Sequence, residues 1–125
     1  MKADAEEEIW LERENVIDWV IKNDDVPVSD LSGLTRAVVC IGSTTIDSAV
    51  WGSGVIWWTD SVTAKTLPDG TSYTGDVVRA KLGLASGFTA GEYENCRLVI
   101  FDADYPSGLV ASDDITFTVY DPCLS

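Results

Sequence analysis

Ile115-Thr-Phe-Thr-Val-Tyr120 is the stretch of sequence that indicates the fold most clearly. Apolar residues alternate along it with threonine, and successive side chains of a β-strand point to opposite faces of its sheet. We therefore predict a strand in which Ile115, Phe117 and Val119 face a hydrophobic core. The residues that face away from this core are Thr116, Thr118 and Tyr120.

Other stretches have the same character and are separated by turn residues. We predict strands over 15–22, 36–41, 44–50, 54–59, 76–82 and 96–101. Residues 60–75 predict a surface loop with a short hairpin around Pro68-Asp69-Gly70, and residues 102–108 predict a hairpin loop. About seven or eight short strands with a turn signal roughly every ten residues are typical of an antiparallel β-sandwich. The predicted fold class is therefore all-β.

The segment 15–22 fits either a strand or a helix. In a strand, Ile17, Trp19 and Ile21 would share one face, whereas a helix would need support from the residues before it. We favour the strand, because β-branched residues and tryptophan dominate the segment and Asn23-Asp24-Asp25 ends it with turn chemistry.

The start of the chain is strongly acidic and predicts a mobile arm. We expect residues 1–14 to form this arm, which could order on a neighbouring molecule, and residues 15–125 to form one β-sandwich domain. Whether residues 5–14 are helix or strand stays open at this point.

The net charge limits the class of partner. The chain has 125 residues with 21 acids against 8 bases, a formal net charge of −13. Such a chain repels phosphate backbones and anionic lipid, so we predict no nucleic-acid and no membrane partner. No apolar run approaches the roughly 20 residues that a membrane helix needs. The same charge favours a basic protein partner.

The sequence contains no histidine, which removes most common catalytic and metal-binding arrangements. Acidic pairs such as Asp102 and Asp104 lie in predicted turns, where aspartate makes turn hydrogen bonds. Asp102-x-Asp104 loosely resembles a calcium loop, but loop positions 5 and 6 hold Pro106 and Ser107. We predict a plain polar hairpin there, no catalytic residue, no cofactor, no metal site and no enzymatic activity.

The cysteines indicate a reducing compartment. Cys40, Cys96 and Cys123 are odd in number and lack the spacing of a metal site. The first eight residues fit neither a signal peptide nor a transit peptide, so we expect synthesis in the cytosol.

Two longer segments carry a family resemblance. Asn15 to Gly33 combines a strand, a polar turn and Pro27-x-x-Asp30-Leu31-x-Gly33, and Gly87-Phe-Thr-Ala-Gly-Glu-Tyr93 leads into a long strand and an Asp-rich turn. With the closing strand, this order resembles the immunoglobulin-like sandwich domains of tailed-bacteriophage virion proteins, such as the N-terminal domain of baseplate upper proteins. The resemblance covers about residues 15–121.

The resemblance implies a structural subunit of a virion, at the neck, the tail or baseplate, or the capsid surface. Its partners would be other virion proteins and further copies of the chain, in a homo-oligomer or ring. The alternative is a small carbohydrate-binding or adhesion module.

The order Cys40, Trp57 or Trp58, Cys96 is also that of true immunoglobulin domains, which leaves an inter-sheet disulfide open. In those domains the tyrosine lies two residues before the cysteine. Here Tyr93 and Cys96 are three apart and would face opposite sides of a regular strand, so we expect free thiols.

Tryptophans are the candidate contact residues. Trp57 and Trp58 are adjacent and must point to opposite faces of a strand, so we expect one in the core and one at the surface. An exposed tryptophan could stack on a sugar ring or anchor a subunit contact, where tryptophan is enriched. We favour the subunit contact and predict the interface candidates Trp10, Trp51 and Trp58.

Overall fold

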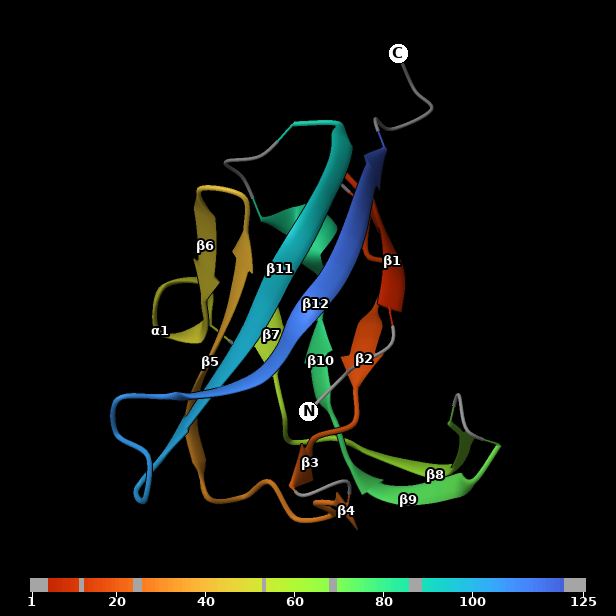
Figure 1. The fold of residues 1–125 in the computed structure, drawn as a ribbon, viewed down its shortest axis with the longest axis vertical. Helices are drawn as coiled ribbons and strands as arrows, with labels where there is room; N and C mark the ends of the chain where they lie inside the picture. The colour runs from red at the N-terminus through yellow and green to blue at the C-terminus, as the bar shows by residue number, and fades with distance from the viewer. Residues whose placement is uncertain are drawn as a thin grey trace.

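Two facing β-sheets make up the body of the molecule (Figure 1). The computed structural model describes residues 5–11, 13–23, 26–52, 54–67, 70–85 and 89–120. The larger sheet contains, in spatial order, β1 (Ala5–Trp10), β12 (Leu109–Tyr120), β11 (Gly91–Asp102), β5 (Leu34–Ile41) and β6 (Thr44–Asp47). The smaller sheet contains β2 (Ile17–Trp19), β10 (Val78–Ala80) and β7 (Ile56–Trp57). The predicted all-β sandwich is confirmed.

The inner faces of the two sheets share one hydrophobic core. On β12, Ile115 and Phe117 are 0% exposed and Val119 is 2% exposed, as the alternation predicts. On β2, Trp19 meets the Phe117 ring edge-on from the opposite sheet, with 6.4 Å between centroids. Ile17, Trp19 and Ile21 are all buried, and the strand predicted over 15–22 is present but shorter, at Ile17–Trp19.

The strand order is that of a variable-type immunoglobulin sandwich. In that arrangement β5, β11 and β12 correspond to strands C, F and G, and β6 corresponds to C′. The smaller sheet, ordered β2-β10-β7, corresponds to B, E and D. The five and three strands of the two sheets match the expected number of about seven or eight. One expectation is corrected: the sandwich is not wholly antiparallel, because β1 pairs parallel with β12.

Residues 5–10 belong to the sandwich, which corrects that part of the arm predicted over residues 1–14; residues 1–4 and 12 lie outside the described residues. β1 runs beside β12 from the pair Ala5 and Ile115 to the pair Trp10 and Tyr120. Ile9 is 1% exposed and belongs to the main core. Burial of its side chain stabilises this segment as a strand, although the neighbouring residues are acidic. Residues 5–10 are therefore strand, and they order on β12 of their own chain.

Shorter elements connect the sheets. β3 (Lys22–Asn23) and β4 (Val26–Pro27) form a small ribbon, and β8 (Ser61–Thr66) and β9 (Ser72–Asp76) form the hairpin expected around residues 68–70.

The strand predicted over 44–50 ends at Asp47, because the Asp47 side chain accepts from Ala49 N–H and caps the helix α1 (Ser48–Trp51). The strand predicted over 54–59 is only the two residues of β7. A 3₁₀ turn, η1 (Leu82–Leu84), follows β10. No helix of the described segments is long and apolar enough to cross a bilayer.

A bulge at the start of β11 corrects the expected orientation of Tyr93 and Cys96. Tyr93 pairs with Phe117 and Cys96 pairs with Ile115, so β11 has one extra residue between the two pairs. Asn95 lies in this bulge and adopts the left-handed backbone conformation, with φ 56°, that accommodates the extra residue. Both side chains consequently face the core.

Tyr93 forms the tyrosine corner of immunoglobulin-like sandwiches. Its hydroxyl donates to the Thr89 carbonyl oxygen at 2.7 Å and accepts from Thr89 N–H at 3.2 Å. The corner ties the connection from the smaller sheet to the start of β11.

Replacing Tyr93 with phenylalanine should lower the free energy of unfolding by about 1 to 2 kcal/mol, because both hydrogen bonds to Thr89 are lost while the ring stays. Urea unfolding followed by tryptophan fluorescence measures this. Tyr105→Phe, at a half-exposed position, is the matched control and should change stability by less than about 0.5 kcal/mol. Equal effects of the two variants would contradict a structural corner.

Candidate functional site

Several loops and short ribbons gather at one end of the sandwich, here called the loop end. It carries the β3–β4 ribbon, the β8–β9 hairpin and the turn 103–108 between β11 and β12, at the lower end of Figure 1, with α1 on the flank. In variable-type immunoglobulin domains the B–C, C′–C″ and F–G loops form the binding surface, and the β3–β4 ribbon, α1 and the turn 103–108 lie in the corresponding connections here. A shared fold does not by itself imply a shared function.

A pocket of about 290 Å³ opens between the β3–β4 segment and the turn 103–108, and is called the loop-end pocket below. Its buried apolar members are Ile21, Leu31 and Ile100, between 2% and 6% exposed, and they form the floor. Its polar members lie nearer to solvent. They are Lys22, Asp30, Asp102, Asp104 and Tyr105.

Contacts to β9 fix one wall of this pocket. Leu31 N–H donates to Asp76 Oδ2 at 2.9 Å, and Asp76 N–H donates to the Ser29 carbonyl oxygen at 2.9 Å. The Tyr73 hydroxyl donates to the Asp76 carbonyl oxygen at 2.5 Å and lies 3.1 Å from the Val28 carbonyl oxygen. Burial raises the pKa of Tyr73, with a smaller contribution from Asp76, so the hydroxyl remains a donor.

The turn 103–108 forms the other wall and is held by its own hydrogen bonds. Asp102 Oδ1 accepts from Asp104 N–H at 2.9 Å and from Tyr105 N–H at 2.8 Å. Gly108 N–H closes the turn onto the Tyr105 carbonyl oxygen at 3.0 Å. The hairpin predicted over 102–108 is confirmed, and the Asp102 carboxylate serves as its cap.

The mouth of the pocket carries an excess of negative charge. Asp30, Asp102 and Asp104 oppose a single ammonium group, that of Lys22. Hydrogen bonds from the side chain and the backbone N–H of Ser32 hold the pKa of Asp30 below its usual value, so this carboxylate is ionised at neutral pH. Within the described part of the chain, no three Asp, Glu, Cys or His side chains group closely enough to hold a metal ion.

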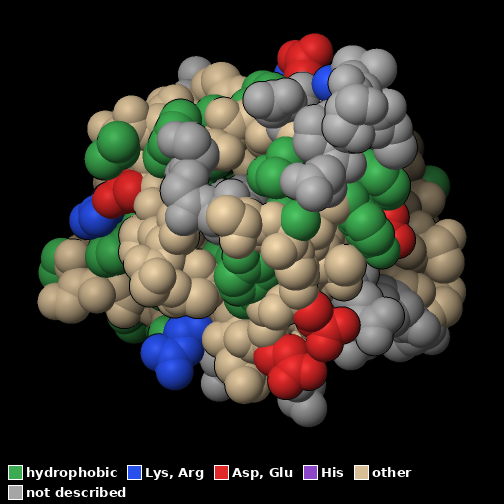
Figure 2. All heavy atoms as spheres, turned by 90° about the horizontal axis from the view of Figure 1, so that it is seen from above, with side chains coloured by type: hydrophobic (Ala, Val, Ile, Leu, Met, Phe, Trp, Pro, Cys, Tyr) green, Lys and Arg blue, Asp and Glu red, His purple; other side chains and the backbone are tan. Residues whose placement is uncertain are grey.

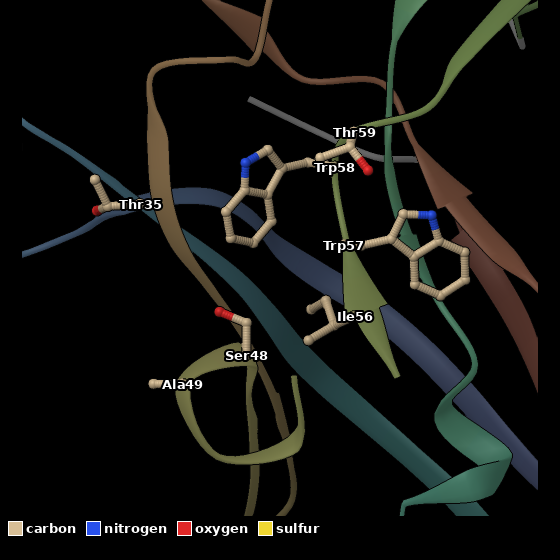
Figure 3. Close-up of a pocket in the computed structure, with 7 residues that line it drawn as sticks. All are labelled: Thr35, Ser48, Ala49, Ile56, Trp57, Trp58 and Thr59. Atoms are coloured by element: carbon tan, nitrogen blue, oxygen red, sulfur yellow. The ribbon is translucent and has the colours of Figure 1, made fainter. Parts of the chain in front are cut away.

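A second hollow, of about 180 Å³, lies beside Trp58 (Figure 3). Thr35, Ser48 and Thr59 contribute hydroxyl groups, and no lining residue is charged. Figure 3 shows the rings of Trp57 and Trp58 on opposite sides of the strand, as predicted. Trp58 packs against the main core, yet neither ring is fully buried.

Trp57 belongs to a polar cluster. Its indole N–H donates to Asp60 Oδ2 at 2.7 Å, and Lys81 Nζ lies 5.8 Å from its ring centroid. Arg79 approaches Asp60 at 3.7 Å. Trp58 therefore lies on the core side, like Ile56 at 1% exposure, and Trp57 lies at the surface, but both rings are only partly buried.

The three interface candidates lie at different places in the structure. Trp10 lies on the edge strand β1 and stacks on Tyr120 with 4.4 Å between ring centroids. Trp51 ends α1, beside the other edge of the sheet, and like Trp58 it packs against the main core. Their role as contacts stays a prediction.

Other large hydrophobic side chains have a greater exposed fraction than the tryptophans. Among the described residues, the large hydrophobic side chains that are clearly exposed are Val16, Val26, Val50, Leu84, Tyr105 and Val110. Sequence reasoning did not select these residues, since single valines in turns and at strand ends carry no pattern.

The cysteines do not form the inter-sheet bridge that the sequence left open. Cys40 and Cys96 are free, and they lie on the adjacent strands β5 and β11 of one sheet. Cys96 faces the core. Cys40 is paired with Arg97, the residue after Cys96, so the two cysteines are not directly opposite each other in the ladder. Burial raises the pKa of the Cys96 thiol, which keeps it protonated and unreactive. Cys123 lies outside the described residues.

Figure 2 shows the end of the molecule opposite the loop end. Hydrophobic side chains form separate groups there, and acidic side chains lie in several places, with the largest group in the lower part of the view. No family model, curated protein or solved structure matches the chain.

Proposed function

We propose that the protein is a non-catalytic assembly module that docks a protein partner at its loop end. The observation that carries this proposal is the distribution of exposed apolar side chains. Of the six named above, Val26, Tyr105 and Val110 lie at the loop end and Val50 lies on the flanking α1. Single exposed apolar residues are ordinary, but several at one end of a domain, where Tyr105 also lines a pocket, are compatible with a protein-binding surface.

The setting that the sequence resemblance supports is a tailed-bacteriophage virion. The protein would be a structural subunit of the neck, the tail or baseplate, or the capsid surface, in contact with other virion proteins. A variable-type sandwich with a tyrosine corner is compatible with that resemblance.

Self-association forms the second part of the proposal. Val50 is 79% exposed on α1, next to β6, which is the open edge of the larger sheet. An edge strand with an apolar neighbour is a ready site for another copy. The opposite edge, β1, carries Glu6, Glu7 and Glu8 in its sequence, and charged edges oppose pairing.

Light scattering of the purified protein tests self-association. We expect a mass that is a multiple of 13.5 kDa, and a larger multimer fraction at moderate than at low salt, because salt screens the repulsion between copies of charge −13. Val50→Ser should reduce this fraction by about tenfold, whereas Val16→Ser, at 48% exposure before β2, should leave it unchanged. A monomer under both conditions would contradict self-association.

A carbohydrate-binding module is the second candidate function. The hollow beside Trp58 supports it, because an aromatic ring, three hydroxyl side chains and the absence of charged lining residues suit a neutral sugar. A glycan screen separates the two functions: binding that is lost in Trp58→Ala would favour the carbohydrate module.

A further inference from the structure

We propose that the loop-end pocket receives an arginine side chain from the partner protein. This inference rests on the proposed docking function and specifies the chemistry of the partner. The pocket combines an apolar floor, an anionic mouth and an aromatic ring, and each of these features matches one part of an arginine side chain.

The size and floor of the pocket suit a long side chain with an aliphatic stem. Its volume of about 290 Å³ lies at the lower limit of small-molecule sites, which span roughly 300–1,000 Å³. Ile21, Leu31 and Ile100 offer apolar surface at the bottom. Arginine and lysine bury such stems along apolar surface while the charged group stays near water.

The charge at the mouth selects a cation. The mouth has three carboxylates and one ammonium group, and the molecule as a whole has a formal net charge of −13. A positive side chain gains from both the local and the overall field, whereas an acidic or phosphorylated side chain would be repelled by both. A metal ion is a poorer fit, because the carboxylates are not grouped closely enough to share one.

Tyr105 favours a guanidinium over an ammonium group. Its side chain is 49% exposed and lines the pocket beside Asp104. A guanidinium can stack on the face of an aromatic ring and pair with carboxylates in the same plane, which a compact ammonium group cannot do.

The pocket is already formed in the free protein. One wall is tied to β9 through Asp76 and Tyr73, and the other is closed by the Asp102 cap. The turn needs no reordering when a side chain enters, so less of the interaction energy is spent on ordering the site.

The test uses N-acetyl-arginine N′-methylamide as the probe, titrated into the ¹⁵N-labelled full chain and followed by amide chemical shifts. The neutral isostere N-acetyl-citrulline N′-methylamide is the matched probe. We expect the arginine probe to shift the amides of residues 21–34 and 100–109, with the citrulline probe at least about threefold weaker. Equal binding of the two probes, or shifts elsewhere, would overturn the proposal.

Charge-removing variants identify the groups responsible. The double variant Asp102→Asn with Asp104→Asn keeps an acceptor oxygen at the turn cap and removes two charges. We expect it to weaken binding of the arginine probe by about threefold to tenfold, as loss of two partly exposed ion pairs predicts. The matched control removes two charges from exposed positions on β11, Glu92→Gln with Glu94→Gln, and should leave the affinity unchanged.

The two proposals fail in distinguishable ways. If the control variant weakens the probe as much as the double variant does, the attraction is only to overall charge and the pocket is not the site. The light-scattering experiment and a search for a docking partner do not depend on either probe. If the pocket does not bind arginine, the proposed docking function can still hold, with a different residue of the partner making the contact.

Discussion

Replacing Phe117 with alanine should lower the free energy of unfolding by about 3 to 5 kcal/mol. Phe117 is 0% exposed in the C-terminal half of β12, and its ring is met edge-on by Trp19 from the smaller sheet. The substitution removes both the buried apolar surface and the contact that joins the sheets, and it leaves a cavity that neighbouring strands cannot close without losing their pairing. Urea unfolding of wild type and variant measures the difference.

Phe101→Ala provides the matched control. Phe101 lies on β11 with its side chain on the outer face of the sheet, where the Arg36 guanidinium lies 4.7 Å above its ring centroid. It is only partly buried, so the same truncation should cost no more than about 2 kcal/mol. A Phe117 variant that loses less than this would show that the two sheets do not depend on a shared core.

The second large effect concerns Gly83. A Cβ atom at this position would overlap the Trp10 carbonyl oxygen and would lie 2.8 Å from the carbonyl oxygen of Arg13. Both obstacles are backbone, so neither can rotate away. Gly83→Ala should therefore destabilise the protein by about 2 to 3 kcal/mol through overpacking.

Hydrogen exchange gives this prediction a local signature. Relief of the overlap requires β1 to move away from η1, so the Leu11 N–H that donates to the Tyr120 carbonyl oxygen should lose protection first. Gly54→Ala is the control, since no atom lies within 4 Å of its Cβ position, and it should change stability by less than about 0.5 kcal/mol. Unchanged protection at Leu11 in a destabilised Gly83 variant would place the strain elsewhere.

Much of the fold was predictable from local patterns. The alternation along 115–120 and the shared face of Ile17, Trp19 and Ile21 identify core residues without any knowledge of their partners. Both predictions succeed because one face of each strand is buried, and a period of two then fixes which residues lie inside.

The elements that depend on distant partners were not predictable. Ala5–Trp10 is acidic and has no alternation of its own, and it becomes a strand because β12 offers it an edge. The bulge at Asn95 reverses the facing of Tyr93 relative to Cys96, and counting residues along a regular strand cannot reveal it.

The candidate site shows the same limit. The loop-end pocket joins residues near 21–34 to residues near 100–109, which only the pairing of β5 with β11 brings together. Asp102 and Asp104 were recognised as turn residues, and that role is observed for Asp102. Their position at the mouth of a pocket follows from the topology alone.

The parallel pairing of β1 with β12 has a mechanical consequence. The chain enters this ladder at Ala5 and leaves it at Tyr120, at opposite ends of six residue pairs. Tension applied to the two ends of the domain would load the β1–β12 hydrogen bonds in shear, all at once, rather than peeling them apart one by one. The domain is thus built to transmit a pulling force along its length, and its resistance to extension resides in the first strand and the last.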